Sequence, residues 1–300
     1  MLITLVGPTA VGKTSLSIQL AQLGQGCILV GDPRQMYRGM DIGTAKPTLE
    51  EQQQAPHFLI DELDPKESFT AGDFERKVEP LIQQLLNSFR VVVVVGGATL
   101  YMDTLWYHLD EMPDIPSEIR SGLQEEFALN GLEPLLSELQ AVDPHTFAHI
   151  DRANHARVMR ALEVFRASGQ PISSFRKGRK PKERNYPVWK IGLQDERNAL
   201  YARINRRVEH MMSRGLEDEV KRLRAAGHHF GQQAMRSIGY QEWDAYFRAE
   251  IDEATLIETI QRNSRRYAKR QLTYWRRYDD IDWFLPQDRE KLINMYQKWL

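Results

Sequence analysis

Short apolar runs alternate with amphipathic stretches through the first hundred positions. Continuous apolar runs that are too short for a helix predict buried strands at residues 2–6, 27–30 and 91–95. Between them, apolar spacing predicts helices at 15–23 and from Ser68 or Thr70, either of which can serve as the N-cap, to Phe89. Residues 39–56 are interpreted as a loop. Buried strands that alternate with helices predict a parallel sheet covered on both faces.

The pattern changes near residues 112–116, where two prolines interrupt the chain. From there to about Arg184 the periodicity predicts helices without a strong strand, at 117–129, 132–139 and 154–167. This stretch closes with residues 176–182, which are basic and broken by glycine and proline. We therefore predict a core domain of residues 1–112 and 185–300 and a helical insertion of residues 113–184.

After the insertion, the pattern returns to a strand followed mainly by helices. Residues 188–193 predict a strand of the core sheet, and 283–285 predict a last edge strand. Helices are predicted at 197–212, 216–226, 239–248, 252–278 and 288–299.

Composition narrows the class of protein. The chain has 300 residues, 42% of them hydrophobic, and a net charge of −1, so a sizeable core is expected and the protein as a whole is not strongly basic. Its one cysteine, Cys27, excludes an intrachain disulfide and a cysteine-based zinc finger. Since no window reaches about 18 apolar residues, we expect a cytoplasmic protein that neither crosses a membrane nor is secreted.

One motif points to chemistry. The pattern G-x-x-x-x-G-K-[ST] is formed by Gly7, Pro8, Thr9, Ala10, Val11, Gly12, Lys13 and Thr14, between a predicted strand and a predicted helix. Such a loop surrounds a phosphate with backbone N–H groups, while the lysine adds charge and the Thr14 hydroxyl can hold Mg²⁺. The sequence thus predicts an α/β protein with a P-loop NTPase-like core, a parallel sheet flanked by helices, and a helical insertion.

A carboxylate is missing where ATP hydrolysis would need one. Many P-loop NTPases carry an Asp at the end of an apolar strand, but the 91–95 run ends in Gly96 and Gly97. Asp32 follows the second predicted strand instead, at the sheet edge where ligands bind. It could assist Mg²⁺, act as a general base on an acceptor, or simply cap the turn before Pro33.

The segment 259–278 contains no acidic residue and is rich in basic and aromatic ones. Its basic residues are Arg262, Arg265, Arg266, Lys269, Arg270, Arg276 and Arg277, and its rings are Tyr267, Tyr274, Trp275 and Tyr278. Phosphate backbones attract such charge, and unpaired bases stack on such rings, so the cluster predicts nucleic-acid binding. Individually, Tyr267 and Trp275 are interpreted as core residues, and His57 as structural.

Together these features resemble the bacterial tRNA dimethylallyltransferases, also called tRNA isopentenyltransferases. The similarity runs nearly end to end and includes the segments 7–14, 32–47, 55–57, 71–74, 96–101, 160–164, 215–220, 237–240 and 269–271. The resemblance implies transfer of a dimethylallyl group from dimethylallyl diphosphate to N6 of the adenosine 3′-adjacent to the anticodon (position 37) of tRNA. It also implies Mg²⁺ as cofactor, held by Thr14 with or without Asp32.

The resemblance further assigns roles to single residues. Asp32 is implied as the base, with Lys13, Thr14 and Arg207 beside the diphosphate. The positions implied to contact the tRNA anticodon stem-loop, including part of the insertion, are Asp32, Pro33, Arg34, Gln35, Ala98, Arg120, Ala156, Arg157, Val158, Met159, Arg160, Arg236, Ser237, Ile238, Gly239, Tyr240, Gln241, Lys269, Arg270, Gln271 and Arg276. A monomer is expected.

Two positions depart from the family pattern. Pro33 stands where the family usually has Ser, and Ala98 where it usually has Thr, so hydrogen-bonding groups are lost near the reacting amine. Three other functions remain open from the residues alone: a P-loop small-molecule kinase that uses ATP, a nucleotide-switched RNA-binding protein without catalysis, and the same transfer to free AMP.

Overall fold

The computed structural model describes residues 1–300, which form two compact units. The core unit comprises Met1–Trp106 and Lys182–Leu300, and the helical unit comprises Tyr107–Pro181. The predicted insertion, residues 113–184, overlaps the helical unit. None of the helices combines the length and apolarity that a membrane crossing requires.

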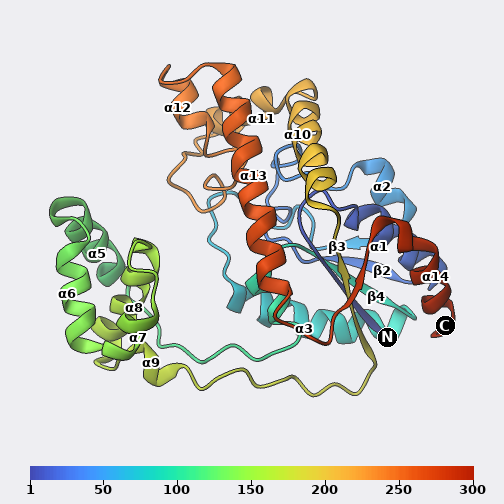
Figure 1. The fold of residues 1–300 in the computed structure, drawn as a ribbon, viewed down its shortest axis with the longest axis horizontal. Coiled ribbons are helices and arrows are strands. Elements are labelled where there is room, and N and C mark those ends of the chain that lie inside the picture. Colours follow the sequence, from blue (N-terminus) through green and yellow to red (C-terminus); the bar gives the residue numbers. More distant parts are fainter. The chain divides into compact units, whose positions relative to one another are not determined.

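One parallel sheet organises the core unit (Figure 1). Its strands are β1 (Leu2–Val6), β2 (Cys27–Val30), β3 (His57–Phe58), β4 (Val92–Val95), β5 (Val188–Leu193) and β6 (Asp282–Phe284), in the order β3-β2-β4-β1-β5-β6. The predicted parallel sheet flanked by helices is confirmed. β4 pairs with both β1 and β2, so the loops that follow these three strands meet at one edge.

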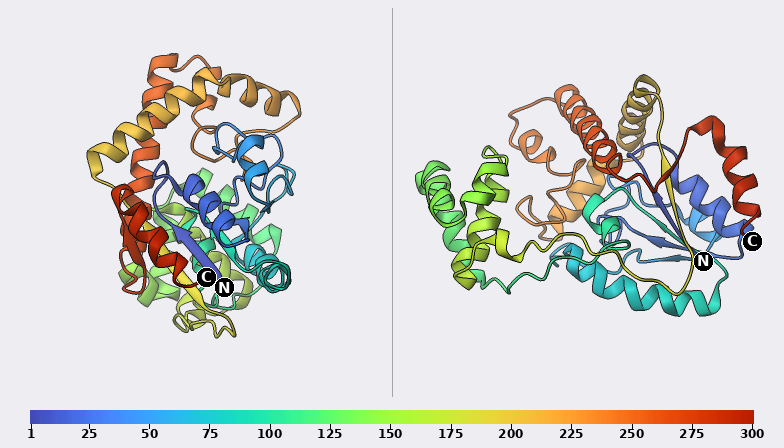
Figure 2. Two further views of the ribbon diagram at one scale, coloured as in Figure 1. Left: turned by 90° about the vertical axis from the view of Figure 1, so that its right-hand side faces the viewer. Right: turned by 60° about the horizontal axis from the view of Figure 1, so that its bottom comes forward.

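Helices cover the sheet because its strands are apolar on both faces. The helices α1 (Lys13–Leu23) and α14 (Arg289–Gln297) lie side by side (Figure 2) and share a core with Ile3, Leu5 and Val93. The first half of α10 (Arg197–Ser213) joins that core. On the opposite face of β1, Thr4 accepts a hydrogen bond from Trp106. Helix α3 (Ala71–Ser88) packs against β4.

Capping chemistry decides where two of the helices begin. Of the two candidates for α3, Thr70 is the N-cap, since its hydroxyl accepts from the Asp73 N–H while Asp73 accepts from the Thr70 N–H. The predicted loop at residues 39–56 was wrong in one part, because α2 (Leu49–Gln54) lies within it. Thr48 and Glu51 form its capping box, a signal that the sequence does contain.

The remaining helices of the core unit are α4 (Thr99–Asp103), α11 (Leu216–Ala225), α12 (Trp243–Phe247), α13 (Glu253–Trp275) and the 3₁₀ turn η1 (Pro286–Asp288). Strand β3 and helix α4, each of five residues or fewer, were not predicted. The predicted helix 239–248 was too long: Gly239 has a φ of 95°, which is left-handed, and regular helix begins only at Trp243.

The helical unit has its own small core. Its helices are α5 (Ser117–Asn130), α6 (Glu133–Val142), α7 (Pro144–His149), α8 (His155–Ser168) and α9 (Ile172–Phe175). Leu123, Leu135, Leu139 and Leu162 are fully buried among them. Asp143 caps α7 by accepting from the Thr146 N–H and also accepts from the Ser173 N–H, which ties α9 to α7. Helices α7 and α9 were not predicted.

Candidate active site

Two cavities open at the carboxyl edge of the sheet, both within the core unit. The phosphate-loop cavity, of about 730 Å³, is lined by residues 9–15 together with Gly96, Gly97 and three arginines of α10, Arg203, Arg206 and Arg207. The adjoining cavity, of about 480 Å³, is lined by residues from the loops after β2 and β4, from α10 and α13, and from residues 236–241. Both cavities share Thr9, Ala10, Asp32, Thr44, Arg207, Met211 and Tyr267, so they meet along one wall.

Two glycines allow the phosphate loop to turn between β1 and α1. Gly7 has a φ of 147° and Gly12 a φ of 100°. A Cβ on Gly7 would lie 2.5 Å from the backbone oxygen of Leu193, so only glycine fits between β1 and β5 here. Beyond Gly12, α1 begins at Lys13 without a side-chain cap. Its first N–H groups therefore face the phosphate-loop cavity as donors for an anion.

Two partly buried cations, Lys13 and Arg207, lie beside this loop. Lys13 Nζ donates to the backbone oxygens of Gly7 and Pro8, at 3.0 and 2.8 Å. Burial lowers the pKa of Lys13 to about 7; the charge of Arg207 also lowers it, while Asp32 raises it. Burial likewise lowers the pKa of Arg207, and Asp32 opposes that shift. Both cations are poorly solvated, so their electrostatic attraction would bind a dianionic ligand placed between them strongly.

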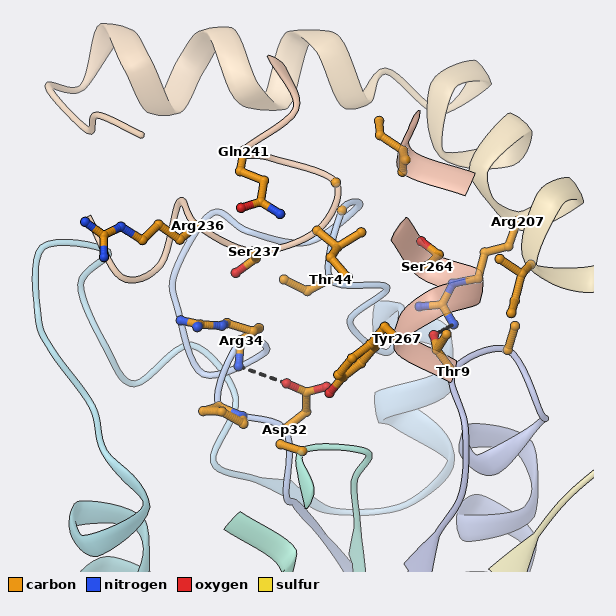
Figure 3. Close-up of a pocket in the computed structure, with 18 of the residues that line it drawn as sticks. Thr9, Asp32, Arg34, Thr44, Arg207, Arg236, Ser237, Gln241, Ser264 and Tyr267 are labelled. Carbon is orange, nitrogen blue, oxygen red and sulfur yellow. Dashed lines mark hydrogen bonds between the residues drawn. The ribbon is translucent and has the colours of Figure 1, made fainter. Parts of the chain in front are cut away.

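Asp32 lies where the two cavities meet (Figure 3). It follows β2, and its Oδ1 accepts a hydrogen bond from the Arg34 N–H at 3.0 Å, which orients the carboxylate. Since β4 separates β2 from β1, the Gly96-Gly97 turn lies between Asp32 and the phosphate loop. A Cβ on Gly96 would lie 2.6 Å from the Gly31 oxygen, so glycine keeps these turns close together.

The adjoining cavity presents polar and cationic groups opposite Asp32. Figure 3 shows Arg34, Arg236, Gln241 and Ser264 around it, with Tyr267 beside Asp32. Arg34 Nη1 is anchored on the Gln233 oxygen at 2.7 Å. Burial raises the pKa of Tyr267 above its ordinary range, so its hydroxyl stays protonated and donates to the Gly97 oxygen at 3.4 Å. The cavity thus combines a carboxylate, donors and an aromatic ring.

The structure brings many of the predicted tRNA-contacting residues to the two cavities. Those that line the adjoining cavity are Asp32, Pro33, Arg34, Ala98, Arg236, Ser237, Ile238, Gly239, Gln241 and Arg270. Gln35 lines the phosphate-loop cavity instead. Lys269 of α13 and Arg276, which caps the end of that helix, are exposed outside both cavities. Tyr240 is fully buried, and its hydroxyl donates to Glu219 at 2.6 Å.

The helical unit holds the other predicted contacts. Val158 is fully buried in its core. Ala156 and Arg157 are exposed and Met159 is partly buried. Arg120 and Arg160 both pair with Glu163, at 3.4 and 3.1 Å. Among these positions, Ala156 and Arg157 are the most accessible to a ligand, together with the paired guanidinium groups.

Three residues that line the cavities, Tyr267, His57 and Arg203, were not predicted as site residues. Tyr267, interpreted as core, lines both cavities, whereas Trp275 is fully buried as predicted. His57, interpreted as structural, lines the phosphate-loop cavity, and its Nδ1 lies 2.8 Å from the Ala55 oxygen. Arg203 Nε donates to the Ala10 oxygen at 3.0 Å. Helical spacing from Arg207 places Arg203 on the same face of α10, a signal that could have found it.

Glu219 lines neither cavity but holds a loop that forms part of their shared wall. Its carboxylate is only 1% exposed and accepts hydrogen bonds from the Tyr240 hydroxyl and from the N–H groups of Asp41, Ile42 and Gly43. These bonds fix the loop that carries Thr44. Helical spacing from Leu216 and Leu223 places Glu219 on the buried face of α11, a signal that could have found it.

Comparisons with known proteins agree with one another. The sequence model of the family described as IPP transferase matches residues 35–278. The tRNA dimethylallyltransferase of Cytophaga hutchinsonii is 42% identical over 95% of this chain and 92% of its own length. The tRNA isopentenylpyrophosphate transferase of Bacillus halodurans has a similar structure, with a TM-score of 0.71 and 37% identity over 99% of this chain and 94% of that one. A eukaryotic dimethylallyltransferase acting on tRNA shares the fold, with a TM-score of 0.76 and 24% identity over 95% of this chain and 73% of that one.

Proposed function

The chain belongs to the IPP transferase family, and on this basis we propose that it transfers a dimethylallyl group from dimethylallyl diphosphate to N6 of the adenosine immediately 3′ of the anticodon of tRNA. It is a tRNA dimethylallyltransferase by family. The observation that carries the proposed chemistry is the wall shared by the two cavities. There, a carboxylate lies between an anion-binding loop and a cavity lined by cations. We therefore propose that this reaction takes place in the cytoplasm.

The reaction then follows from which groups face each cavity. The diphosphate occupies the phosphate-loop cavity and the adenine occupies the adjoining one, so the allylic carbon lies at the shared wall. The N6 lone pair forms the new C–N bond as the C–O bond breaks, and diphosphate leaves with the electron pair of the C–O bond. Asp32 accepts the N6 proton. To reach this wall, the adenine must leave the stack of the anticodon loop.

Electrostatic stabilisation of the departing diphosphate comes from groups already in place. Lys13, Arg207 and the N–H groups at the start of α1 surround the site where negative charge develops. Because they are held in advance, they need not reorganise during the reaction. Arg207 Nη1 is fixed by its 3.2 Å hydrogen bond to Thr9 Oγ1.

The oxygen ligands near the loop suit a magnesium ion. Mg²⁺ in proteins usually takes one or two protein oxygens together with substrate phosphates and water. The Thr14 hydroxyl and the Asp32 carboxylate both line the phosphate-loop cavity and supply this kind of donor set. When bound, Mg²⁺ would neutralise charge on the leaving diphosphate. We propose Thr14 as its protein ligand. Asp32 could be a second ligand in addition to accepting the proton.

A direct assay tests the function. The protein is incubated with Mg²⁺, dimethylallyl diphosphate and unmodified tRNA, and the digested nucleosides are weighed by mass spectrometry. A dimethylallyl-adenosine from tRNA supports the proposal. The same product only from free AMP, phosphorylation with ATP in place of dimethylallyl diphosphate, or RNA binding without product would each contradict it.

The lowered pKa of Lys13 predicts a pH dependence of diphosphate binding. Since that pKa is about 7 in the free protein and an anion raises it, binding above pH 7 requires proton uptake. We expect the dissociation constant of magnesium diphosphate to rise with pH above 7, by up to about tenfold per pH unit. Calorimetry at several pH values measures this, and Lys13→Met should remove the slope. A slope that persists in that variant would assign the titration to another group.

Arg270, an exposed arginine of α13, predicts a salt-dependent contribution to tRNA affinity. Arg270 lines the adjoining cavity, and its guanidinium lies 5.8 Å from the centre of the Tyr267 ring. We expect Arg270→Ala to weaken tRNA binding and to reduce the slope of log affinity against log salt by about one. Filter binding over a salt series measures both. Arg248→Ala, an exposed arginine outside the cavities, is the matched control and should leave the slope unchanged.

A further inference from the structure

Gln271 is a buried residue of α13 at the lining of the phosphate-loop cavity. It is 1% exposed, whereas its neighbours Lys269 and Arg270 are exposed. The resemblance assigned Gln271 to the tRNA contacts. Its burial and its partners indicate a different role.

The side-chain amide of Gln271 joins two turns that follow different strands. Its Oε1 accepts a hydrogen bond from the Thr9 N–H at 2.9 Å, and its Nε2 donates to the Gly97 oxygen at 2.8 Å. A neutral primary amide can accept and donate in this way at the same time, whereas a carboxylate can only accept. One buried side chain therefore fixes the phosphate loop relative to the turn beside Asp32.

Thr9 is thereby held at its backbone N–H and at its hydroxyl. Its N–H is bound by Gln271, and its hydroxyl accepts from Arg207. The Thr9 N–H is thus already satisfied and is not one of the donors for the diphosphate. Instead, its hydrogen bond to Gln271 sets the curvature of the loop. Thr9, which lines both cavities, thereby links Arg207 to Gln271.

Gly97 makes room for this amide. A Cβ at position 97 would lie 2.3 Å from Gln271 Nε2, which is the end of a flexible side chain. The glycine after β4 therefore does more than form a tight turn. It admits the Gln271 amide between β4 and the phosphate loop.

We propose that Gln271 is a positioning residue that holds the phosphate loop in its diphosphate-binding shape, and that it makes no contact with tRNA. This inference rests on the proposed function for the identity of the diphosphate. Preorganised donors bind an anion without the cost of ordering the loop, so loss of the amide should weaken diphosphate binding.

The test compares the two ligands in Gln271→Met, which keeps the length of the side chain without its amide. We expect the dissociation constants of dimethylallyl diphosphate and of inorganic diphosphate, each with Mg²⁺, to rise about tenfold or more, from two buried hydrogen bonds lost. That of unmodified tRNA should stay within about twofold of wild type. A rise for tRNA with unchanged diphosphate binding would overturn the inference and restore the tRNA contact.

Two further variants separate this effect from misfolding and from failure of the proposed function. Gly97→Ala displaces the amide without removing it and should show the same selective loss of diphosphate binding. The double variant should bind diphosphate no more weakly than the single variant with the lower affinity, because both changes act through the same amide. Lys269→Ala, two residues before Gln271 but exposed, should instead affect tRNA binding alone. If the wild-type protein binds inorganic diphosphate but not dimethylallyl diphosphate, the proposed dimethylallyl donor is wrong. The role of Gln271 is then still tested by the affinity of Gln271→Met for inorganic diphosphate.

Discussion

Replacing Asp32 with alanine is expected to reduce turnover by roughly 100-fold or more while leaving tRNA affinity nearly unchanged. Asp32 is the carboxylate at the wall shared by the two cavities, and a general base contributes mainly to the chemical step. Single-turnover rates with saturating tRNA and dimethylallyl diphosphate measure the effect without a contribution from product release.

Asp32→Asn sharpens the assignment. Asparagine keeps an oxygen that can accept from the Arg34 N–H, so the local turn is preserved while the basic group is lost. We expect a loss similar to that of the alanine variant. Asp279→Ala, an exposed acid of the core unit outside both cavities, should leave turnover unchanged. Near-normal turnover in Asp32→Asn would remove proton transfer from the role of this residue.

Replacing Lys13 with methionine is expected to lower kcat/KM by roughly 100-fold or more, with most of the loss in diphosphate affinity and transition-state stabilisation. Lys13 is the partly buried ammonium of the phosphate loop, and methionine keeps its length without its charge. Steady-state rates together with calorimetric titration of dimethylallyl diphosphate separate binding from chemistry.

The same variant should be more stable than wild type near neutral pH. The folded-state pKa of Lys13, about 7, lies below its unfolded value, so the unfolded chain binds more protons between these values. Lys13 therefore destabilises the fold when the pH falls below its unfolded pKa, and this cost is absent at higher pH. A raised Tm with lost activity distinguishes a removed functional group from a damaged fold. Lys221→Ala, an exposed lysine of α11 paired with Glu217, should change neither quantity much.

Local patterns were sufficient for several parts of this protein. Apolar runs gave the positions of five of the six strands, since a buried parallel strand requires a continuous apolar segment. The spacing of Gly7, Gly12 and Lys13 gave the phosphate loop, because that geometry depends on neighbouring residues alone. The short elements β3, α4, α7 and α9 were missed because two to six residues carry too little periodicity.

What the sequence by itself determined is the kind of chemistry: an anion-binding loop, a carboxylate after the second strand, and a basic helix. Only the tertiary structure decided how these meet. The strand order places β4 between β1 and β2, which sets Gly96 and Gly97 between the phosphate loop and Asp32. Packing of α13 brought Gln271 to Thr9, which is 262 residues away in the chain, and turned Tyr267 toward both cavities. Such contacts depend on which faces become buried together, and no local spacing of residues specifies that.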